Sequence, residues 1–90
     1  MEIAVFEAAC TSIFAAVSNG ADTLDKEGCK AFGDKLYQMA TGDETVTVKE
    51  EKFEAMWEKA NASGEGKIAF PVLYAMALAK GQKDGKVKSE

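Results

Sequence analysis

The sequence contains no histidine and no arginine, and each absence excludes a class of function. Without histidine, the chain cannot assemble the serine–histidine–aspartate or cysteine–histidine groups of many hydrolases. Without arginine, it cannot hold a phosphate group in a forked guanidinium contact. The sequence also lacks a glycine-rich phosphate loop and a recognisable nucleophile–base pair. We therefore expect a binding protein and not an enzyme.

Cysteines and long apolar runs are also scarce. Cys10 and Cys29 lie in apolar helical patterns without metal-ligand spacing, so we expect reduced thiols in a core. The longest apolar run, 68–79, contains the single proline and is shorter than the ~20 residues that span a bilayer. The first residues lack the basic region of a secretion signal. These features predict a cytoplasmic protein without membrane insertion.

Positive charge comes from lysine alone and is unevenly distributed. The 90 residues carry 11 lysines and 15 acids, for a net charge of −4. Residues 1–79 hold seven lysines against thirteen acids, whereas 80–90 hold four against two. An acidic body disfavours nucleic acid and suits a basic helical partner or a cation. We expect one folded domain over 1–80 and a flexible lysine-rich tail over 81–90.

Apolar residues recur at three- and four-residue spacing in four segments, which predicts four amphipathic helices. The first helix is expected over about 2–18, and the second over about 26–40. Asp25 can cap the start of the second helix, and Gly42 can end it in a left-handed conformation. Gly33 lies inside this helix, where it either lets another helix approach closely or is simply a weak point.

The two later helices have their own start signals. Thr47 and Glu50 have the spacing of a capping box, so the third helix is expected to begin near Val48. Pro71 suits the first turn of the fourth helix, where a missing N–H costs nothing. The helices together predict an all-α fold.

The segment 61–72, between the third and fourth helices, follows the pattern of a twelve-residue calcium loop. Such a loop has oxygen ligands at positions one, three, five and seven, a glycine at six and an apolar residue at eight. Those positions are held in order by Asn61, Ser63, Glu65, Lys67, Gly66 and Ile68. Val72 occupies the twelfth position, where a glutamate should supply two oxygens. The loop therefore keeps the pattern of a calcium loop but lacks this glutamate, the clamp that would hold the metal.

The segment 18–28 resembles the second half of such a loop. Leu24 fits the apolar eighth position, and Gly28 then occupies the twelfth. No register places acids at the first, third and fifth positions together, so we expect no calcium here. We expect instead a structural turn whose Leu24 pairs with Ile68 in a short β-bridge.

These two helix–loop–helix units resemble a paired EF-hand lobe of the calmodulin superfamily over about residues 2–80. The strongest segment is 53–70, which has helix, loop and apolar eighth position in order. The resemblance implies a four-helix EF-hand-like pair, similar to light chains that bind a helical segment of a larger protein. Any association with the cytoskeleton would then come through that partner.

In this superfamily a methionine-bearing groove accepts an amphipathic helix, because thioethers fit varied apolar surfaces. The same side chains would also serve as ordinary core residues. The expected groove residues are Phe32, Met39, Phe53, Met56, Trp57, Leu73 and Met76.

The leading hypothesis is thus an interaction module that binds an amphipathic, basic helix without calcium or another cofactor. One alternative is a weak calcium sensor or buffer that uses Glu65 in the second loop. In either case the remaining ligand positions are Asn61, Ser63, Glu65 and Lys67. A third hypothesis is a self-associating structural dimer, formed through the fourth helix and Gly33.

Overall fold

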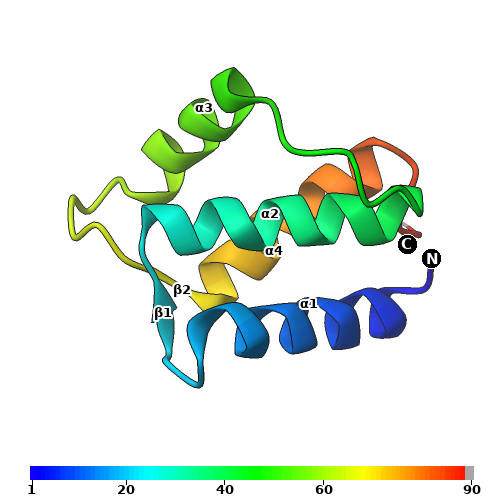
Figure 1. Ribbon diagram of the computed structural model, residues 1–90, viewed down its shortest axis with the longest axis horizontal. Coiled ribbons are helices and arrows are strands. Elements are labelled where there is room, and N and C mark those ends of the chain that lie inside the picture. Colours follow the sequence, from blue (N-terminus) through cyan, green and yellow to red (C-terminus); the bar gives the residue numbers. More distant parts are fainter. Residues whose placement is uncertain (89–90) are drawn as a thin grey trace.

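The computed structural model describes residues 1–88 and is mostly helical, which confirms the all-α prediction at this level (Figure 1). Residues 89–90, at the end of the expected tail, lie outside the described residues. Within residues 1–88, none of the helices combines the length and the apolar character that a membrane span requires. The elements are α1 (Ile3–Ser18), β1 (Thr23–Leu24), α2 (Lys26–Thr41), α3 (Glu50–Ala60), β2 (Ile68–Ala69) and α4 (Phe70–Lys83).

The first two helices begin and end close to the predicted residues. The Asp25 carboxylate accepts a hydrogen bond from the N–H of Gly28 at 2.8 Å and so caps α2. Gly42 ends α2 with φ +70°, and its N–H donates to the carbonyl of Gln38 at 2.8 Å. Both caps confirm their sequence signals, because each satisfies backbone groups that a helix end leaves free.

The third helix begins later than predicted. α3 starts at Glu50, and its N-cap residue, Lys49, makes no side-chain capping hydrogen bond, so the expected Thr47–Glu50 capping box is wrong. The N–H of Val48 instead donates to the Asp34 carboxylate of α2 at 2.8 Å. This contact between residues fourteen positions apart holds Val48 against α2, so the local signal at Thr47 does not decide where α3 begins.

The two loops are joined by the predicted β-bridge. β1 and β2 pair antiparallel, with Leu24 opposite Ile68 and Thr23 opposite Ala69. Leu24 and Ile68 are only 4% and 3% exposed, so the bridge is also part of the core. The pairing fixes the start of α2 relative to the start of α4.

All four helices contribute to one apolar core, in which α1 packs against both α2 and α4 (Figure 1). The ring of Phe14 meets Phe70 edge-on, with centroids 5.2 Å apart, an arrangement that aromatic pairs prefer. The buried residues are Phe6, Cys10, Phe14, Leu24, Cys29, Phe32, Phe53, Trp57, Ile68, Leu73 and Val87.

The segment 81–88 packs against the domain, contrary to the flexible tail expected from its lysines and glycines. α4 continues to Lys83, and Val87 is only 4% exposed. Gly85, with φ +75°, turns the chain back, and the N–H of Lys88 donates to the carbonyl of Met1 at 2.8 Å. The buried Val87 and these backbone hydrogen bonds hold this polar stretch against the domain in the structure.

Candidate functional site

The second loop holds its shape through its own hydrogen bonds. The side-chain oxygen of Asn61 accepts from the N–H of Gly66 at 2.8 Å, and its carbonyl accepts from the N–H of Gly64 at 2.9 Å. Gly66 has φ +74°, the left-handed conformation that a sharp turn at the sixth position requires. The predicted turn is therefore present, and the Asn61 oxygen that would face a metal already has a partner.

The remaining ligand positions offer few oxygen atoms. Ser63, Glu65 and Lys67 are exposed, and Glu65 is the loop's only carboxylate. Val72 lies on the first turn of α4 and is 46% exposed, so an apolar side chain stands where the clamp would be. Among residues 1–88, no three acidic, cysteine or histidine side chains gather into a metal-binding group. The loop thus has the predicted turn with only one carboxylate, that of Glu65, at its ligand positions.

Gly28 in the first loop has a packing role. A Cβ atom added there would lie 2.9 Å from Cδ2 of Leu24. Leu24 is buried in the β-bridge, so a larger residue at position 28 would require the end of its side chain to shift. The glutamate that a calcium loop needs at its twelfth position would therefore disturb this packing.

Four of the seven expected groove residues lie in the core of this structure. Phe32, Phe53, Trp57 and Leu73 are between 1% and 9% exposed, and therefore do not line an open groove. Met56 and Met76 are half-buried at intermediate exposure, whereas Met39 is 38% exposed. The sequence pattern identifies apolar helix faces, but these faces pack into a closed core to which α3 contributes Phe53 and Trp57.

α3 is attached mainly by side chains. Figure 1 shows its ribbon standing apart from α2 and α4. Phe53 and Trp57 reach from α3 into the core, and Glu54 forms an exposed ion pair with Lys26 of α2 at 2.8 Å. Aromatic side chains such as these bury ~150–250 Å² of surface each, and this burial dominates the energetics of a core. An exposed ion pair, in contrast, contributes at most ~1 kcal/mol to stability. The two rings therefore supply most of the attachment.

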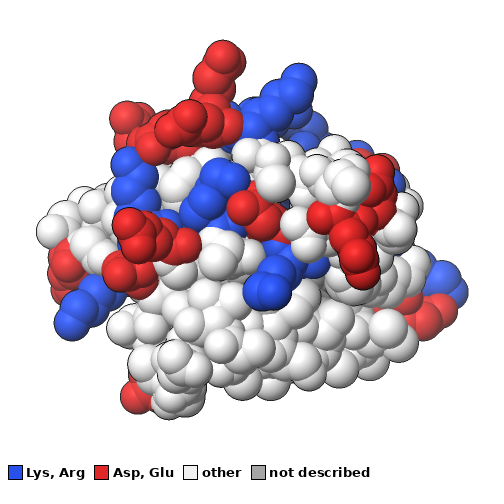
Figure 2. All heavy atoms as spheres, in the orientation of Figure 1, with Lys and Arg blue, Asp and Glu red and all other residues white. Residues whose placement is uncertain are grey.

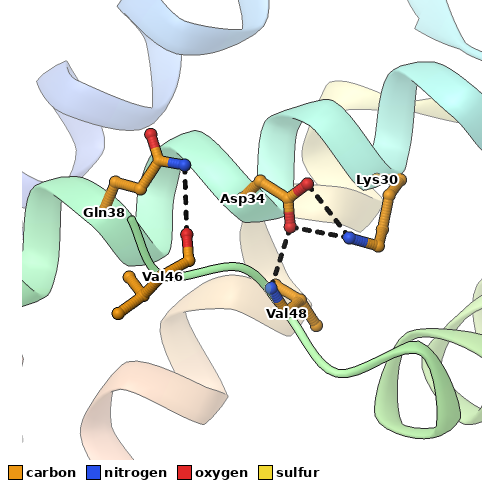
Figure 3. Close-up of polar contacts among 5 residues, drawn as sticks. All are labelled: Lys30, Asp34, Gln38, Val46 and Val48. Atoms are coloured by element: carbon orange, nitrogen blue, oxygen red, sulfur yellow. Dashed lines mark hydrogen bonds and ion pairs between the residues drawn. The ribbon is translucent and has the colours of Figure 1, made fainter. Parts of the chain in front are cut away.

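The linker between α2 and α3 is fixed to α2 by polar contacts that the sequence did not reveal (Figure 3). Asp34 accepts from the Val48 N–H and pairs with Lys30 at 2.8 Å, while the Gln38 side chain donates to the carbonyl of Val46 at 3.1 Å. A Cβ on Gly33 would lie 3.3 Å from Cγ2 of Val48. The close approach expected at Gly33 thus involves this linker and not another helix.

Both thiols are buried and free of disulfides. Burial raises the pKa of Cys10 and of Cys29 from 9.0 to about 11, and the negative charges of Glu7 and Asp25, respectively, act in the same direction. A thiol with such a pKa stays protonated at neutral pH and is a poor nucleophile. The prediction that both cysteines lie in the core is confirmed.

Comparison with known proteins assigns no family. No protein-family model, curated protein or solved structure matches the chain. The resemblance to the calmodulin superfamily therefore rests on particular residues of the two loops, above all Leu24, Gly66 and Ile68.

Proposed function

We propose that this chain is a calcium-independent interaction module, an EF-hand-like pair of helix–loop–helix units that binds a helical segment of a larger protein in the cytoplasm. The observation that carries the proposal is the second loop, which closes through the hydrogen bond from Gly66 to Asn61. A loop held in this way positions β2 and α4 without an ion. Val72 at the twelfth position removes the contact through which calcium would move α4.

The proposed binding surface is the part of the core that α3 covers. Phe53 and Trp57 lie in the same core cluster as Phe32 and Leu73. A partner helix could take the place of these two rings, because it would offer the same kind of apolar contact. The half-buried Met56 and Met76 would then contact the partner, since an unbranched thioether adapts to a new neighbour at little cost.

The charge of the module indicates which helices it would bind. α3 carries four glutamates on an 11-residue helix, and the whole chain has a net charge of −4. An amphipathic helix with lysines or arginines on its polar side would be attracted to this surface, whereas a nucleic acid would be repelled. Binding, and not catalysis, is the proposed activity.

A model peptide tests the proposal directly. The peptide would carry leucines at i, i+3, i+4 and i+7, lysines elsewhere and no tryptophan, so that Trp57 is the only emitting indole. We expect a saturable change in Trp57 fluorescence in the presence of a chelator, and the same affinity after calcium is added. A peptide of equal composition with its leucines scattered should bind at least about tenfold more weakly.

Two matched variants locate the binding surface. Met76→Ala removes a half-buried methionine of the proposed surface, whereas Val72→Ala shortens an exposed residue of the same helix. We expect weaker peptide binding only for Met76→Ala. Binding that appears only with calcium, or that is equally strong for the scattered peptide, would contradict the proposal.

A further inference from the structure

The turn that follows α1 contains an asparagine and a glycine in succession, both in the left-handed conformation. Asn19 ends the helix with φ 54° and ψ 38°, and among residues 1–88 it is the only residue other than glycine with a positive φ. Gly20 follows with φ +87°. Both residues are exposed, and Figure 1 shows their turn at the lower edge of the molecule, between α1 and β1. Solvent therefore reaches the whole dipeptide.

The rest of the described chain holds this dipeptide only weakly. Within residues 1–88, neither the side-chain amide of Asn19 nor the N–H of Gly20 takes part in a hydrogen bond. The turn is closed by the N–H of Ala21, which donates to the carbonyl of Ser18 at 3.1 Å. A Cβ atom added to Gly20 would have no heavy atom within 4 Å apart from its chain neighbours. The dipeptide thus has both free reacting groups and room to move.

An asparagine followed by glycine can react with its own backbone. Asparagine is a thermolabile residue, and a following glycine leaves the backbone nitrogen uncrowded by a side chain. That nitrogen attacks Cγ of the asparagine, a new C–N bond forms, and the bond from Cγ to the amide nitrogen breaks. The amide nitrogen leaves as ammonia and carries away the backbone proton, so that a succinimide ring remains. Water then opens the ring at either carbonyl and gives aspartate or isoaspartate.

Ring closure at Asn19 requires a rotation within the turn. At ψ 38° the Gly20 nitrogen points away from Cβ of Asn19, so the Cα–C bond must rotate before the nitrogen can reach Cγ. The rotation breaks the hydrogen bond between Ala21 and Ser18, whereas the β-bridge begins only at Thr23. Local opening of the turn, and not unfolding of the domain, is therefore the step that exposes the side chain to attack.

Asn61 is the only other asparagine in the sequence, and its surroundings differ at each point. Its side-chain oxygen accepts from the N–H of Gly66 at 2.8 Å, and its carbonyl accepts from the N–H of Gly64 at 2.9 Å. The next residue is Ala62, whose side chain crowds the attacking nitrogen. The chain thus contains its own control for a reaction at Asn19.

We propose that Asn19 is a site of spontaneous deamidation, at which the Gly20 nitrogen displaces ammonia and water then leaves aspartate or isoaspartate. Either product adds a negative charge at the C-terminal end of α1, where the helix dipole is also negative. Isoaspartate in addition inserts one carbon atom into the main chain between α1 and β1. The site lies outside the residues of the proposed helix-binding surface, so each property can be present without the other.

Peptide mass spectrometry after incubation of the purified chain in mildly alkaline buffer tests this proposal. Cleavage after lysine separates the two asparagines, on peptides 1–26 and 60–67. We expect peptide 1–26 to gain about 1 Da and to split into two chromatographic products, one for each ring opening. Peptide 60–67 should change at least about tenfold more slowly. A higher pH should speed the reaction, because the attacking nitrogen must lose its proton.

Asn19→Gln is the matched variant, because it keeps the amide but would need a six-membered ring, and its peptide 1–26 should keep its mass. A free peptide of residues 16–23 shows that the conditions support the reaction. An unchanged peptide 1–26 from the wild type under conditions that convert the free peptide would overturn the proposal. Equal rates at Asn19 and Asn61, or an equal gain of mass in Asn19→Gln, would do the same.

Discussion

Val87 lies so close to Gly81 that a Cβ atom on the glycine would stand 2.7 Å from Cγ2 of the valine. This contact holds the returning chain against the end of α4 and beside Phe6. Gly81→Ala should destabilise the fold by about 1–2 kcal/mol, because overpacking outweighs the gain in helix propensity. Urea unfolding followed by circular dichroism measures the change.

The Val87→Ala background provides the control for that prediction. With the valine shortened, an alanine at position 81 has room, so the same substitution should stabilise by about 0.5–1 kcal/mol. If Gly81→Ala changed the stability in the same direction in both backgrounds, Val87 would not pack on Gly81.

Asp34→Ala should destabilise by about 1–3 kcal/mol, because it leaves the half-buried Val48 N–H without an acceptor and also removes the pair with Lys30. Asp43→Ala is a suitable comparison. The Asp43 carboxylate accepts from the N–H and hydroxyl of Thr45, and these bonds lower its pKa, but the group is fully exposed. Urea midpoints for the two variants should differ clearly, and similar midpoints would contradict the role of Asp34.

The start and end of α2 and the start of α4 could be predicted from the sequence, because their signals are local. Asp25, Gly42 and Pro71 each act within one helical turn, where residue type determines the backbone conformation. The start of α3 could not be predicted, since it depends on Asp34, fourteen residues before Val48. The ordering of 81–88 was missed for a similar reason, because Gly81 reads as a helix breaker unless its contact with Val87 is known.

Only part of the proposed binding surface could be predicted from the sequence. Apolar spacing shows which side of a helix avoids water, but it does not show what covers that side. Phe53 and Trp57 were expected to line a groove, but they lie in the core and keep the surface closed.

Ser18→Ala should stabilise the fold by about 1 kcal/mol, since the Ser18 hydroxyl oxygen is buried and has no hydrogen-bond partner within the described residues. Ser12→Ala, on the exposed side of the same helix, measures the effect of helix propensity alone. Thermal unfolding of the two variants at low protein concentration gives the difference. A Ser18→Ala protein no more stable than the Ser12→Ala protein would show that the hydroxyl finds a partner.

Stability should fall as pH rises from about 9 to about 11. In this window the unfolded chain loses the thiol protons of Cys10 and Cys29, whereas the folded chain keeps them, because its thiol pKa values are about 11. The slope is about 1.4 kcal/mol per pH unit for each thiol. Below the unfolded pKa the contribution is constant. Urea titrations at several pH values should show the decline, and Cys29→Ala should reduce its slope even if that variant is less stable at neutral pH.

Val72→Glu should give the second loop its missing clamp. With only Glu65 and the new glutamate as carboxylates, we expect calcium binding in the range of about 10⁻⁴–10⁻³ M. Val72→Gln, which has the same shape without the charge, should bind far more weakly. Calorimetric titration in a magnesium background compares the two variants with the wild type. Micromolar binding by the wild type would favour the alternative of a calcium sensor.

The two ends of the described chain meet, since the Met1 ammonium donates to the carbonyl of Lys86 at 3.0 Å, while Lys88 donates back to Met1. The first residue and the last described residues therefore lie side by side. A circular permutant could join these ends through a short bridge and open at the exposed turn 42–45, between α2 and α3. α3 would then lead the chain and α2 would end it, with β1 still paired to β2. The order of the two units along the polypeptide is thus incidental to how they pair.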